Sequence, residues 1–399
     1  MSSSNQQNSH DGAAANGSAG KPADYVIVGA GIFGTALAWN LVGAGASVTV
    51  LERRTVASGA SGGPGHRGVR ANNRDLRELP LVVRALEIWP TLTEALGQQS
   101  GFERIGGLSI GEAERIRGSQ GRVTLQARAD VQNAYGARTE ILDEAGVRAR
   151  LPQVSGNVKY ALYNPDDGIA DHTQATRAFA AAAQARGVEL REGAEVVAVR
   201  EEGGVASVIL ASGEHVRAGR AVILAANTHV DGLLTESFGL RLPVWTFNPQ
   251  VATIKVSRAL KLDHLVNHNS RSLSIKRADA DHVTVTGGGV GTWDDATEIG
   301  TSNLNTLSAS LAALTATFPI TAADAHVVDV EASRADSSSV DQIPIIDRVP
   351  GHPAVWFATG WSGHGFAIGP AVAEAVAQGL LEQRIPAVLQ PFGLHRFRP

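Results

Sequence analysis

Residues 24–53 read DYVIVGAGIFGTALAWNLVGAGASVTVLER, and this stretch decides the fold. Residues 25–28 form a continuous apolar run, as expected for a parallel strand that is buried on both faces. Glycines stand at 29, 31 and 34, followed by a helical pattern to about residue 42 and a second strand at 47–51. Strand, helix and strand in this order predict a βαβ unit, and hence an α/β fold with a doubly wound, Rossmann-type sheet.

The segment GAGIFG at 29–34 fits the pattern GxGxxG. Gly29 permits a tight turn, Gly31 lets a pyrophosphate approach the backbone, and Gly34 lets helix and strand pack closely. The helix N-terminus then presents free N–H groups and the positive end of its dipole to the anion. Glu52 ends the second strand at the spacing expected for a carboxylate that accepts both ribose hydroxyls and repels a 2′-phosphate. The motif therefore favours FAD or NAD over NADP without choosing between them.

Composition excludes several classes of protein. The 399 residues include 35 basic and 39 acidic side chains, a net charge of -4, and no cysteine. No long run of one charge occurs, which argues against a nucleic-acid or acidic-membrane partner. Without cysteine, disulfides, cysteine-ligated zinc, iron–sulfur clusters and a cysteinyl cofactor bond are excluded. Only five residues are lysines, so mechanisms that need a lysine have few candidates.

The N-terminal residues 1–22 are mostly small and polar, which predicts a disordered tail. No apolar stretch of signal-peptide type and no run of 18 or more apolar residues occurs in the sequence. We therefore expect a soluble, cytoplasmic protein without a membrane segment.

Two further loops carry candidate chemistry. The loop SGASGGPGHRGVRANN at 58–73 can lie flat against an extended cofactor, with Arg67 and Arg70 in reach of an anionic group. The segment ATGWSGHGFAIGPAVAEAVAQGL at 358–380 predicts a strand, a glycine-rich loop at 360–369 and a helix from Pro370 to Leu381. Aimed at the pyrimidine end of a flavin, this helix terminus would stabilise the negative charge that develops on reduction.

Together these segments resemble the FAD-dependent D-amino-acid oxidase (DAO) superfamily, in the branch of sarcosine oxidases and related N-methyl-amino-acid and glycine oxidases. The resemblance covers nearly the whole chain beyond the tail and rests on the opening stretch together with SGASGG, NPDDGIADHTQATRAFAAAAQARGVELREGAEV, RAVILAAN, GWSGHGF and PFGLHRF. It implies a discontinuous FAD-binding domain (23–75, 145–240 and 335–399). A substrate domain on a mostly antiparallel sheet (76–144 and 241–334) would be interleaved with it.

The resemblance also implies roles for individual residues. The residues that it places against the cofactor are Gly29, Gly31, Gly34, Glu52, Arg53, Ser58, Ser61, Gly62, Gly63, His66, Val197, Gly363, His364 and Gly365. Arg67 and Arg70 align with arginines that lie over the flavin and bind the substrate carboxylate, and Arg334 falls near a position that clamps this carboxylate. We count Arg67, Arg70, His364 and Arg334 as the candidate catalytic residues. For Arg334, a structural salt bridge is an equally good interpretation.

The sequence departs from the family pattern in three places. A cysteinyl flavin is impossible, so FAD is either noncovalent or attached through a histidine, for which His66 is the best-placed candidate. Ala367 stands where the family often has a lysine that helps to hold the carboxylate. The oxygen-activating lysine of sarcosine oxidases falls near Thr284 or Val285, and Lys276 or Lys255 are the possible substitutes.

Other polar residues have simpler interpretations. The twelve histidines show no metal-ligand spacing, and no metal site is predicted. The pair Asp166-Asp167 is typical of a turn rather than of acid–base chemistry.

The sequence thus predicts an FAD-dependent oxidoreductase that oxidises a C–N bond of a small secondary amine or amino acid. Hydride would pass to flavin N5, the imine would hydrolyse, and O2 or another acceptor would reoxidise the flavin. Two alternatives stay open: oxidation of a C–OH bond in a hydroxy acid or other alcohol, and a flavoprotein subunit of a heteromeric sarcosine-oxidase-like complex. The main prediction and the two alternatives are all compatible with a homo- or hetero-oligomer.

Overall fold

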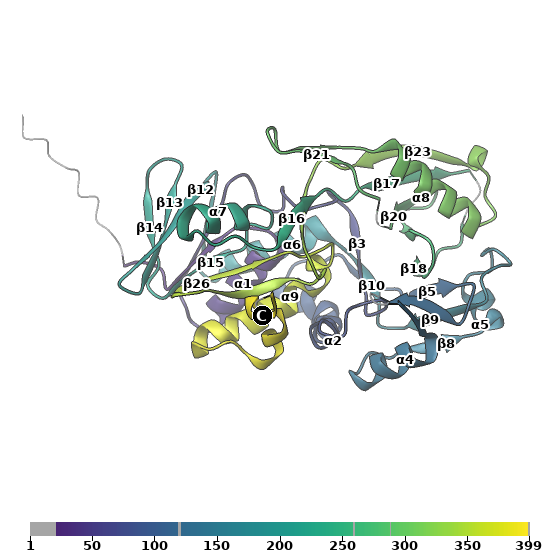
Figure 1. Ribbon diagram of the computed structural model, residues 1–399, viewed down its shortest axis with the longest axis horizontal. Helices are drawn as coiled ribbons and strands as arrows, with labels where there is room; N and C mark the ends of the chain where they lie inside the picture. Colours follow the sequence, from purple (N-terminus) through teal and green to yellow (C-terminus); the bar gives the residue numbers. More distant parts are fainter. Residues whose placement is uncertain (1–20, 119–120, 258–259, 288, 398–399) are drawn as a thin grey trace, which may run out of the picture.

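A computed structural model describes residues 21–118, 121–257, 260–287 and 289–397. The disordered tail predicted for residues 1–22 lies almost entirely outside these residues. Figure 1 shows two lobes along the long axis, one built from both ends of the chain and the other from its blue and green middle segments. No helix in the described ranges is both long enough and apolar enough to cross a membrane.

A six-stranded sheet forms the centre of the first lobe. In spatial order its strands are β11 (Glu189–Glu192), β2 (Val48–Glu52), β1 (Tyr25–Val28), β15 (Ala221–Leu224), β26 (His352–Thr359) and β25 (Ile345–Val349). All neighbours are parallel except β25, which runs antiparallel to β26. The predicted βαβ unit is confirmed, because β1 and β2 are adjacent, parallel and joined by α1 (Ile32–Gly43).

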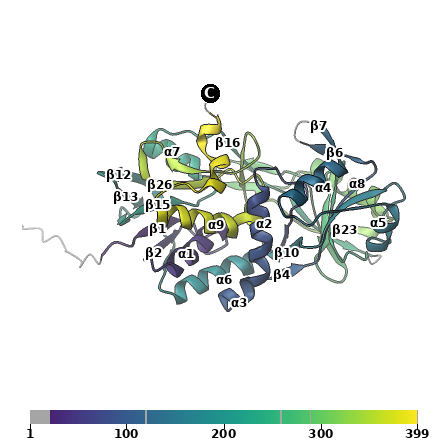
Figure 2. The ribbon, with the colours of Figure 1, turned by 90° about the horizontal axis from the view of Figure 1, so that it is seen from below.

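Both faces of this sheet are covered, which explains why β1 is apolar throughout. Tyr25 and Ile27 pack into a core with α1, α6 (His172–Ala185) and α9 (Gly365–Glu382). Val26 and Val28 face a second core, shared with α7 (His229–Phe238) and the antiparallel sheet β12 (Val196–Glu202), β13 (Val205–Leu210) and β14 (His215–Arg217). Figure 2 shows α1, α6 and α9 together on one side of the sheet.

The second lobe contains an eight-stranded sheet. In spatial order its strands are β23 (Ala325–Glu331), β17 (Val251–Val256), β20 (His282–Thr286), β19 (Ser274–Arg277), β18 (Leu265–His268), β5 (Gly107–Gly111), β9 (Tyr160–Asn164) and β8 (Glu140–Leu142). Only β18 and β5 pair in parallel. Leu108 and Ile110 of β5 pack into one core with α5 (Glu144–Arg150) and α8 (Leu304–Thr317). The mostly antiparallel sheet expected from the family resemblance is therefore confirmed.

Strand β9 affects where the two domains divide. It lies within 145–240, which the sequence assigns to the FAD-binding domain, but it pairs with β5 and β8 in the eight-stranded sheet. Its neighbour α5 packs into the core of that sheet as well. We propose that the boundary lies after Asn164, because β9 buries its apolar residues only when it is paired with β5.

Smaller elements complete the fold. The sheet β3 (His66–Val69), β10 (Gly168–Asp171) and β4 (Phe102–Arg104) is antiparallel, and Figure 1 places β3 and β10 between the two lobes. The other elements are α2 (Leu79–Ile88), α3 (Leu92–Leu96), α4 (Leu125–Ala134) and the strand pairs β6 (Arg115–Gly118) with β7 (Gly121–Thr124), β16 (Val244–Phe247) with β24 (Asp336–Ser339), and β21 (Thr292–Asp294) with β22 (Ile299–Thr301).

The start of α9 corrects one prediction. The sequence places it at Pro370, but the helix begins at Gly365 and Pro370 lies inside it. The first turn is held by aromatic packing, since the Phe366 ring centroid lies 5.0 Å from that of Trp89. A Cβ at Gly365 would lie 2.8 Å from the Trp361 ring. The absence of a side chain at Gly365 therefore lets the first turn of α9 pack directly against this indole. Tertiary packing thus compensates for the helical hydrogen bond that is lost because Pro370 has no backbone N–H.

Candidate functional site

The turn between β1 and α1 separates its three glycines into two roles. At Gly29 φ is +111°, and an added Cβ would lie 2.6 Å from the carbonyl oxygen of Ala225. An added Cβ at Gly34 would lie 2.0 Å from the Gly29 carbonyl oxygen. At Gly31, by contrast, a Cβ would meet no heavy atom within 4 Å. The chain itself requires Gly29 and Gly34, while Gly31 leaves open space at the N-terminus of α1.

This open space suits a phosphate group. Gly31 is the N-cap of α1 and carries no side chain that could cap the first N–H groups of the helix. These groups lack intrahelical acceptors, and the positive end of the helix dipole lies at the same place. The turn therefore fits the pyrophosphate of a dinucleotide.

Glu52 stands beside this turn, at the end of β2. Its Oε2 accepts a hydrogen bond from the Ala30 backbone N–H at 2.8 Å, and its Oε1 accepts one from Arg54 N–H at 2.9 Å. The carboxylate is thus held by the backbone next to the glycine turn, and each oxygen keeps a further lone pair for a ribose hydroxyl.

Val197 and Arg53 lie in the same region with different surroundings. The pairing of β12 with β13 skips Val197, which sits in a bulge and leaves its side chain exposed. Arg53 forms an ion pair with Glu298, which lies in the turn between β21 and β22. The distance from Arg53 Nη1 to Glu298 Oε2 is 2.9 Å. The bulge presents the backbone expected to face an adenine, whereas Arg53 lies in an ion pair.

The loop at 58–63 is held by two arginines. The Arg67 guanidinium donates to the carbonyl oxygens of His66 at 2.9 Å, Gly63 at 2.5 Å and Gly62. Gly62 and Gly63 both have φ of +70°, and a Cβ at Gly63 would lie 2.9 Å from Arg334 Nη1. The loop depends on glycine to let these guanidinium groups approach.

Arg334 lies in a salt bridge. Its Nη1 lies 2.9 Å from Glu331 Oε2, and its Nε donates to the Ser58 carbonyl at 2.8 Å. The Ser58 hydroxyl donates to the Thr55 carbonyl at 2.7 Å, and Ser61 is partly buried in the same loop. Arg334 therefore connects the end of β23 to the loop at 58–63.

Two histidines flank β3 and β10. His66 Nε2 lies 3.9 Å from Glu103 Oε1, and about a third of its side chain is exposed. His172, at the start of α6, is buried, and its Nε2 has no hydrogen-bond partner among the described residues. Burial, together with the nearby Arg67, lowers the pKa of His172 to about 4, so its imidazole is neutral.

Arg70 is partly buried and lies near three buried charged residues, and we define Arg70, Arg74, Asp167 and Lys276 as the buried charged cluster. Burial and the neighbouring Arg74 lower the pKa of Arg70 to about 9. Its Nη1 donates to the Asn72 carbonyl at 2.5 Å. Arg74 is buried as well, and its Nη1 has no hydrogen-bond partner within the described chain.

Asp167 corrects the prediction of a simple turn pair. Asp166 does close a turn, since its N–H donates to Asn164 Oδ1 at 2.9 Å. Asp167 is instead fully buried, and its Oδ1 accepts from the Ala71 N–H at 2.7 Å. Burial raises its pKa to about 7, against the effect of Ala71 N–H and Arg70. It thus joins β10 to the segment that carries Arg70.

Lys276 completes the cluster from β19, where it pairs with Thr284 of β20. It is only 2% exposed, and burial with the nearby Arg67 and Arg70 lowers its pKa to about 7. Lys255 lies 3.3 Å from Asp281 with 53% of its side chain exposed. Of the two lysines considered from the sequence, Lys276 therefore lies beside the arginines and Lys255 lies on the surface.

The loop before α9 brings Gly363 and His364 to the same region. Gly363 has φ of +79°, and its N–H donates to Asp336 Oδ2 at 2.8 Å. His364 Nδ1 lies 3.2 Å from the carboxylate of Glu78. Arg70 and Arg74 both lie close enough to influence the pKa of His364. The predicted flavin loop and the arginines therefore meet.

Sequence reasoning missed Arg74, Glu78, Asp167 and Asp336. All four are charged residues that the fold buries. Arg74 and Glu78 lie in an irregular segment before α2, where sequence spacing carries no signal of a shared face. Asp167 and Asp336 carry no local signal either, because their partners lie far away in the sequence.

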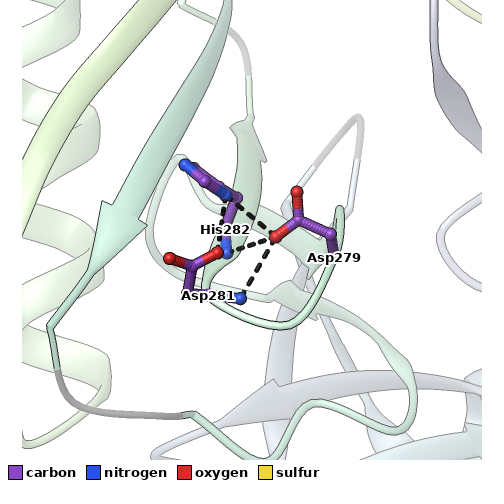
Figure 3. Close-up of side chains that lie close together, drawn as sticks. All are labelled: Asp279, Asp281 and His282. Carbon is purple, nitrogen blue, oxygen red and sulfur yellow. Dashed lines mark hydrogen bonds and ion pairs between the residues drawn. The ribbon is translucent and has the colours of Figure 1, made fainter.

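A separate group of possible ligands lies in the β19–β20 hairpin (Figure 3). Asp279 Oδ1 accepts from the N–H groups of Asp281 at 3.1 Å and His282 at 2.9 Å, and lies 2.8 Å from His282 Nδ1. Half or more of each aspartate side chain is exposed. These bonds close a turn, and turn closure by itself explains the arrangement.

Comparisons with known proteins agree with this geometry. The family model described as FAD dependent oxidoreductase (DAO) matches residues 24–379. The chain is 27% identical to a sarcosine oxidase subunit beta from Arthrobacter sp, over 94% of this chain and 91% of the relative. It is 24% identical to N-methyl-L-tryptophan oxidase from Escherichia coli, over 94% and 99%.

Solved structures show the same fold. L-proline dehydrogenase from P. horikoshii superposes with a TM-score of 0.78 at 23% identity, covering 94% of this chain and 98% of that one. The family match spans most of the chain, and the glycine turn and Glu52 fit the dinucleotide. The chain therefore belongs to the DAO family of FAD-dependent oxidoreductases, and its cofactor is FAD.

Proposed function

We propose that this enzyme oxidises the C–N bond of a small amino acid or N-methyl amino acid. The observation that carries the proposal is the buried charged cluster, where the three cations Arg70, Arg74 and Lys276 lie near two buried acids, Asp167 and Glu78, so that positive charge is in excess. Buried cations need counter-charges. A substrate carboxylate supplies one, and similarity to a sarcosine oxidase subunit and an N-methyl-L-tryptophan oxidase supports the amine.

Arg70 is the proposed carboxylate anchor. A guanidinium binds a carboxylate through two parallel hydrogen bonds, and Arg70 uses one of its N–H groups on the Asn72 carbonyl. Such binding orients the rest of the substrate and lowers the entropy that the reaction must lose. Arg67 and Arg334 are proposed to shape the cofactor loop, because their guanidinium groups are occupied by loop carbonyls and by Glu331.

When bound, FAD supplies the two-electron oxidation, with the substrate hydride accepted at N5. The product imine is then hydrolysed by water. We propose noncovalent FAD, because His66 lies beside Glu103 and the chain has no cysteine. Acid precipitation tests this: flavin that stays with the pellet would establish a covalent bond.

Lys276 supports an oxidase rather than a dehydrogenase. A cation beside the site stabilises the negative charge that develops on O2 as it accepts electrons. The family resemblance places an oxygen-activating lysine near Thr284. Lys276 pairs with Thr284 on the neighbouring strand. Its pKa of about 7 lets it carry a proton in part of the molecules at neutral pH.

The test is anaerobic bleaching of the FAD absorbance by a panel of sarcosine, N-methyl-L-tryptophan, L-proline, glycine, D-amino acids and hydroxy acids, followed by air. We expect bleaching by one or more amines and recolouring in air. Bleaching by hydroxy acids alone would establish oxidation of a C–OH bond instead. Bleaching that persists in air would identify a dehydrogenase.

A second candidate is a subunit that works only in a complex. It is favoured by the similarity to a protein named as a sarcosine oxidase subunit. In that case, the purified FAD-loaded chain is bleached by no member of the panel. Light scattering on the chain copurified from its native host would then show a larger, heteromeric assembly.

A further inference from the structure

Glu78 is a buried carboxylate with one side-chain hydrogen bond. It immediately precedes α2, where its backbone carbonyl accepts from the Val82 N–H at 2.9 Å and begins the helix. Its side chain is 0% exposed. Across 286 positions of sequence, its carboxylate lies 3.2 Å from Nδ1 of His364, at the start of α9. The contact therefore joins two helices that enter the site from different parts of the chain.

Helix capping does not explain this carboxylate. Glu78 makes no side-chain cap to α2. No ion pair within 4.0 Å joins it to Arg74 among the described residues, although Arg74 contributes to its electrostatics. A carboxylate buried in this way is strongly unfavourable unless a hydrogen-bonded partner compensates for the lost water. His364 is that partner, so the pair is maintained by its own interaction.

Glu78 determines which ring nitrogen of His364 carries the hydrogen. Burial opposes ionisation of Glu78, but attraction to the protonated form of His364, the hydrogen bond from Nδ1 and the charge of Arg74 together hold the pKa of this carboxyl below its ordinary value. The hydrogen bond and Arg74 remain when the ring is neutral. An ionised carboxylate only accepts hydrogen bonds, so Nδ1 of His364 donates and Nε2 keeps its lone pair. About a quarter of the His364 side chain remains exposed, and Nε2 has no partner within the described chain.

The charged groups that face His364 favour a neutral ring at rest. Burial lowers the pKa of His364, Arg74 and Arg70 act in the same direction, and Glu78 opposes them. The imidazole is therefore free to accept a proton at Nε2. Once it is protonated, Glu78 stabilises the resulting imidazolium across the Nδ1 bond, as the carboxylate does in an acid–histidine pair.

We propose that Glu78 is a positioning residue that holds His364 so that its Nε2 takes a proton from the ammonium group of the substrate. The inference rests on the proposed function, since it assigns the step that prepares an amine for oxidation. The N–H bond of the ammonium breaks, a new N–H bond forms at Nε2, and the nitrogen keeps the electron pair. The proton leaves from Nε2 to water, through the exposed part of the ring.

The first experiment compares Glu78→Gln with wild type in stopped-flow reduction of the FAD-loaded protein under anaerobic conditions. The reductant is the amine of the panel that bleaches wild type fastest. An amide carries no charge and can donate to Nδ1 as well as accept from it, so Glu78→Gln no longer favours the form of His364 with a free Nε2 and no longer stabilises its imidazolium. We expect reduction at pH 7 to slow by roughly 100-fold, and Glu78→Asp to recover part of this loss. Glu374→Gln, an exposed acid on α9 that pairs with Arg84, is the matched control and should reduce at the wild-type rate.

The second readout separates positioning from a structural role. In wild type, the reduction rate falls as the pH drops through the His364 titration, and in Glu78→Gln this limb should vanish from the profile. The ¹⁵N shifts of labelled His364, assigned with His364→Gln, should show hydrogen on Nδ1 in wild type and a larger share of hydrogen on Nε2 in Glu78→Gln. Far-UV circular dichroism and FAD content verify the fold, and Glu78→Asp replaces Glu78→Gln if the latter does not fold.

The outcomes are distinct. An unchanged rate and pH profile in Glu78→Gln, or hydrogen on Nε2 of wild-type His364, overturns the inference. Failure of every amine to bleach wild type overturns the proposed function instead. The ¹⁵N measurement still decides the geometry of the pair in that case, because it needs no substrate.

Discussion

The glycine turn at 29–34 and the buried charged cluster around Arg70 handle charge in opposite ways. The turn offers backbone N–H groups, a helix dipole and open space at Gly31, and it contains no charged side chain. The cluster brings together side-chain charges from separate elements, including Arg70, Asp167 and Lys276. The turn meets backbone within its own six residues and at Ala225, all in the first lobe, whereas the cluster includes Lys276 from the second lobe.

The difference predicts how each region responds to substitution. Close contacts in the turn are between backbone atoms, which cannot move without breaking β1 or α1. Close contacts in the cluster involve side chains, which can be relieved by a second substitution. Substitutions at Gly34, Gly107 and Lys276 test this contrast, and one at Asp279 gives the reference for an exposed turn outside both regions.

Gly34→Ala should be the most damaging change in the turn. Its Cβ would lie 2.0 Å from the Gly29 carbonyl oxygen, so α1 must shift away from β1. We expect a loss of roughly 3 kcal/mol or more in unfolding free energy, measured by urea denaturation. Gly31→Ala is the matched control: it should change apo stability by about 1 kcal/mol or less but weaken FAD binding in titrations. Equal effects of the two variants on apo stability would contradict this division of roles.

Gly107→Ala tests a contact with a side chain. The new Cβ would lie 2.3 Å from Asp167 Oδ2, which pushes this carboxylate away from the Ala71 N–H. We expect a loss of roughly 2 kcal/mol, smaller than for Gly34→Ala because a side chain can turn aside. Adding Asp167→Gly, which removes both Oδ2 and the Cβ at 2.7 Å, should recover part of the stability. A double variant no more stable than Gly107→Ala would show that the strain lies in the backbone of β5.

Lys276→Met tests the charge in the cluster through pH. The folded pKa is about 7 and the ordinary value is 10.5, so between these values the unfolded chain binds more protons. The stability contributed by this residue should therefore rise with pH across that window, by up to about 1.4 kcal/mol per unit. Urea midpoints at pH 7 to 10 should show that Lys276→Met loses this rise. Lys255→Met, at the exposed lysine, should keep the wild-type slope; a parallel slope in both variants would place the titration elsewhere.

Asp279→Asn should have the smallest effect. The hairpin in Figure 3 is closed by hydrogen bonds to Asp279 Oδ1, which an amide oxygen can still accept. We expect a loss of about 0.5 kcal/mol, since exposed ion pairs contribute little. Adding EDTA should leave the melting temperature of wild type unchanged. A clear fall in that temperature with EDTA would mean that the hairpin holds a metal.

The FAD half of the site was predictable because its signals are local. Gly29, Gly31, Gly34 and Glu52 follow one another at spacings set by a single βαβ unit. For the charged residues near the predicted flavin loop, the sequence singled out Arg67, Arg70 and His364 as candidates but not Glu78 and Asp167. Glu78 meets its partner 286 residues away, and no local pattern marks a buried acid whose partner is distant.

Lys276 shows what only the tertiary structure decided. From the sequence, Lys276 and Lys255 were equal candidates, because both lie on strands with alternating apolar residues. The fold buries one beside Arg67 and Arg70 and leaves the other on the surface beside Asp281. The βαβ unit, the dinucleotide turn and the exclusion of cysteine chemistry follow from neighbouring residues and composition alone. The choice among charged residues depended on burial, which arises only when distant segments pack together.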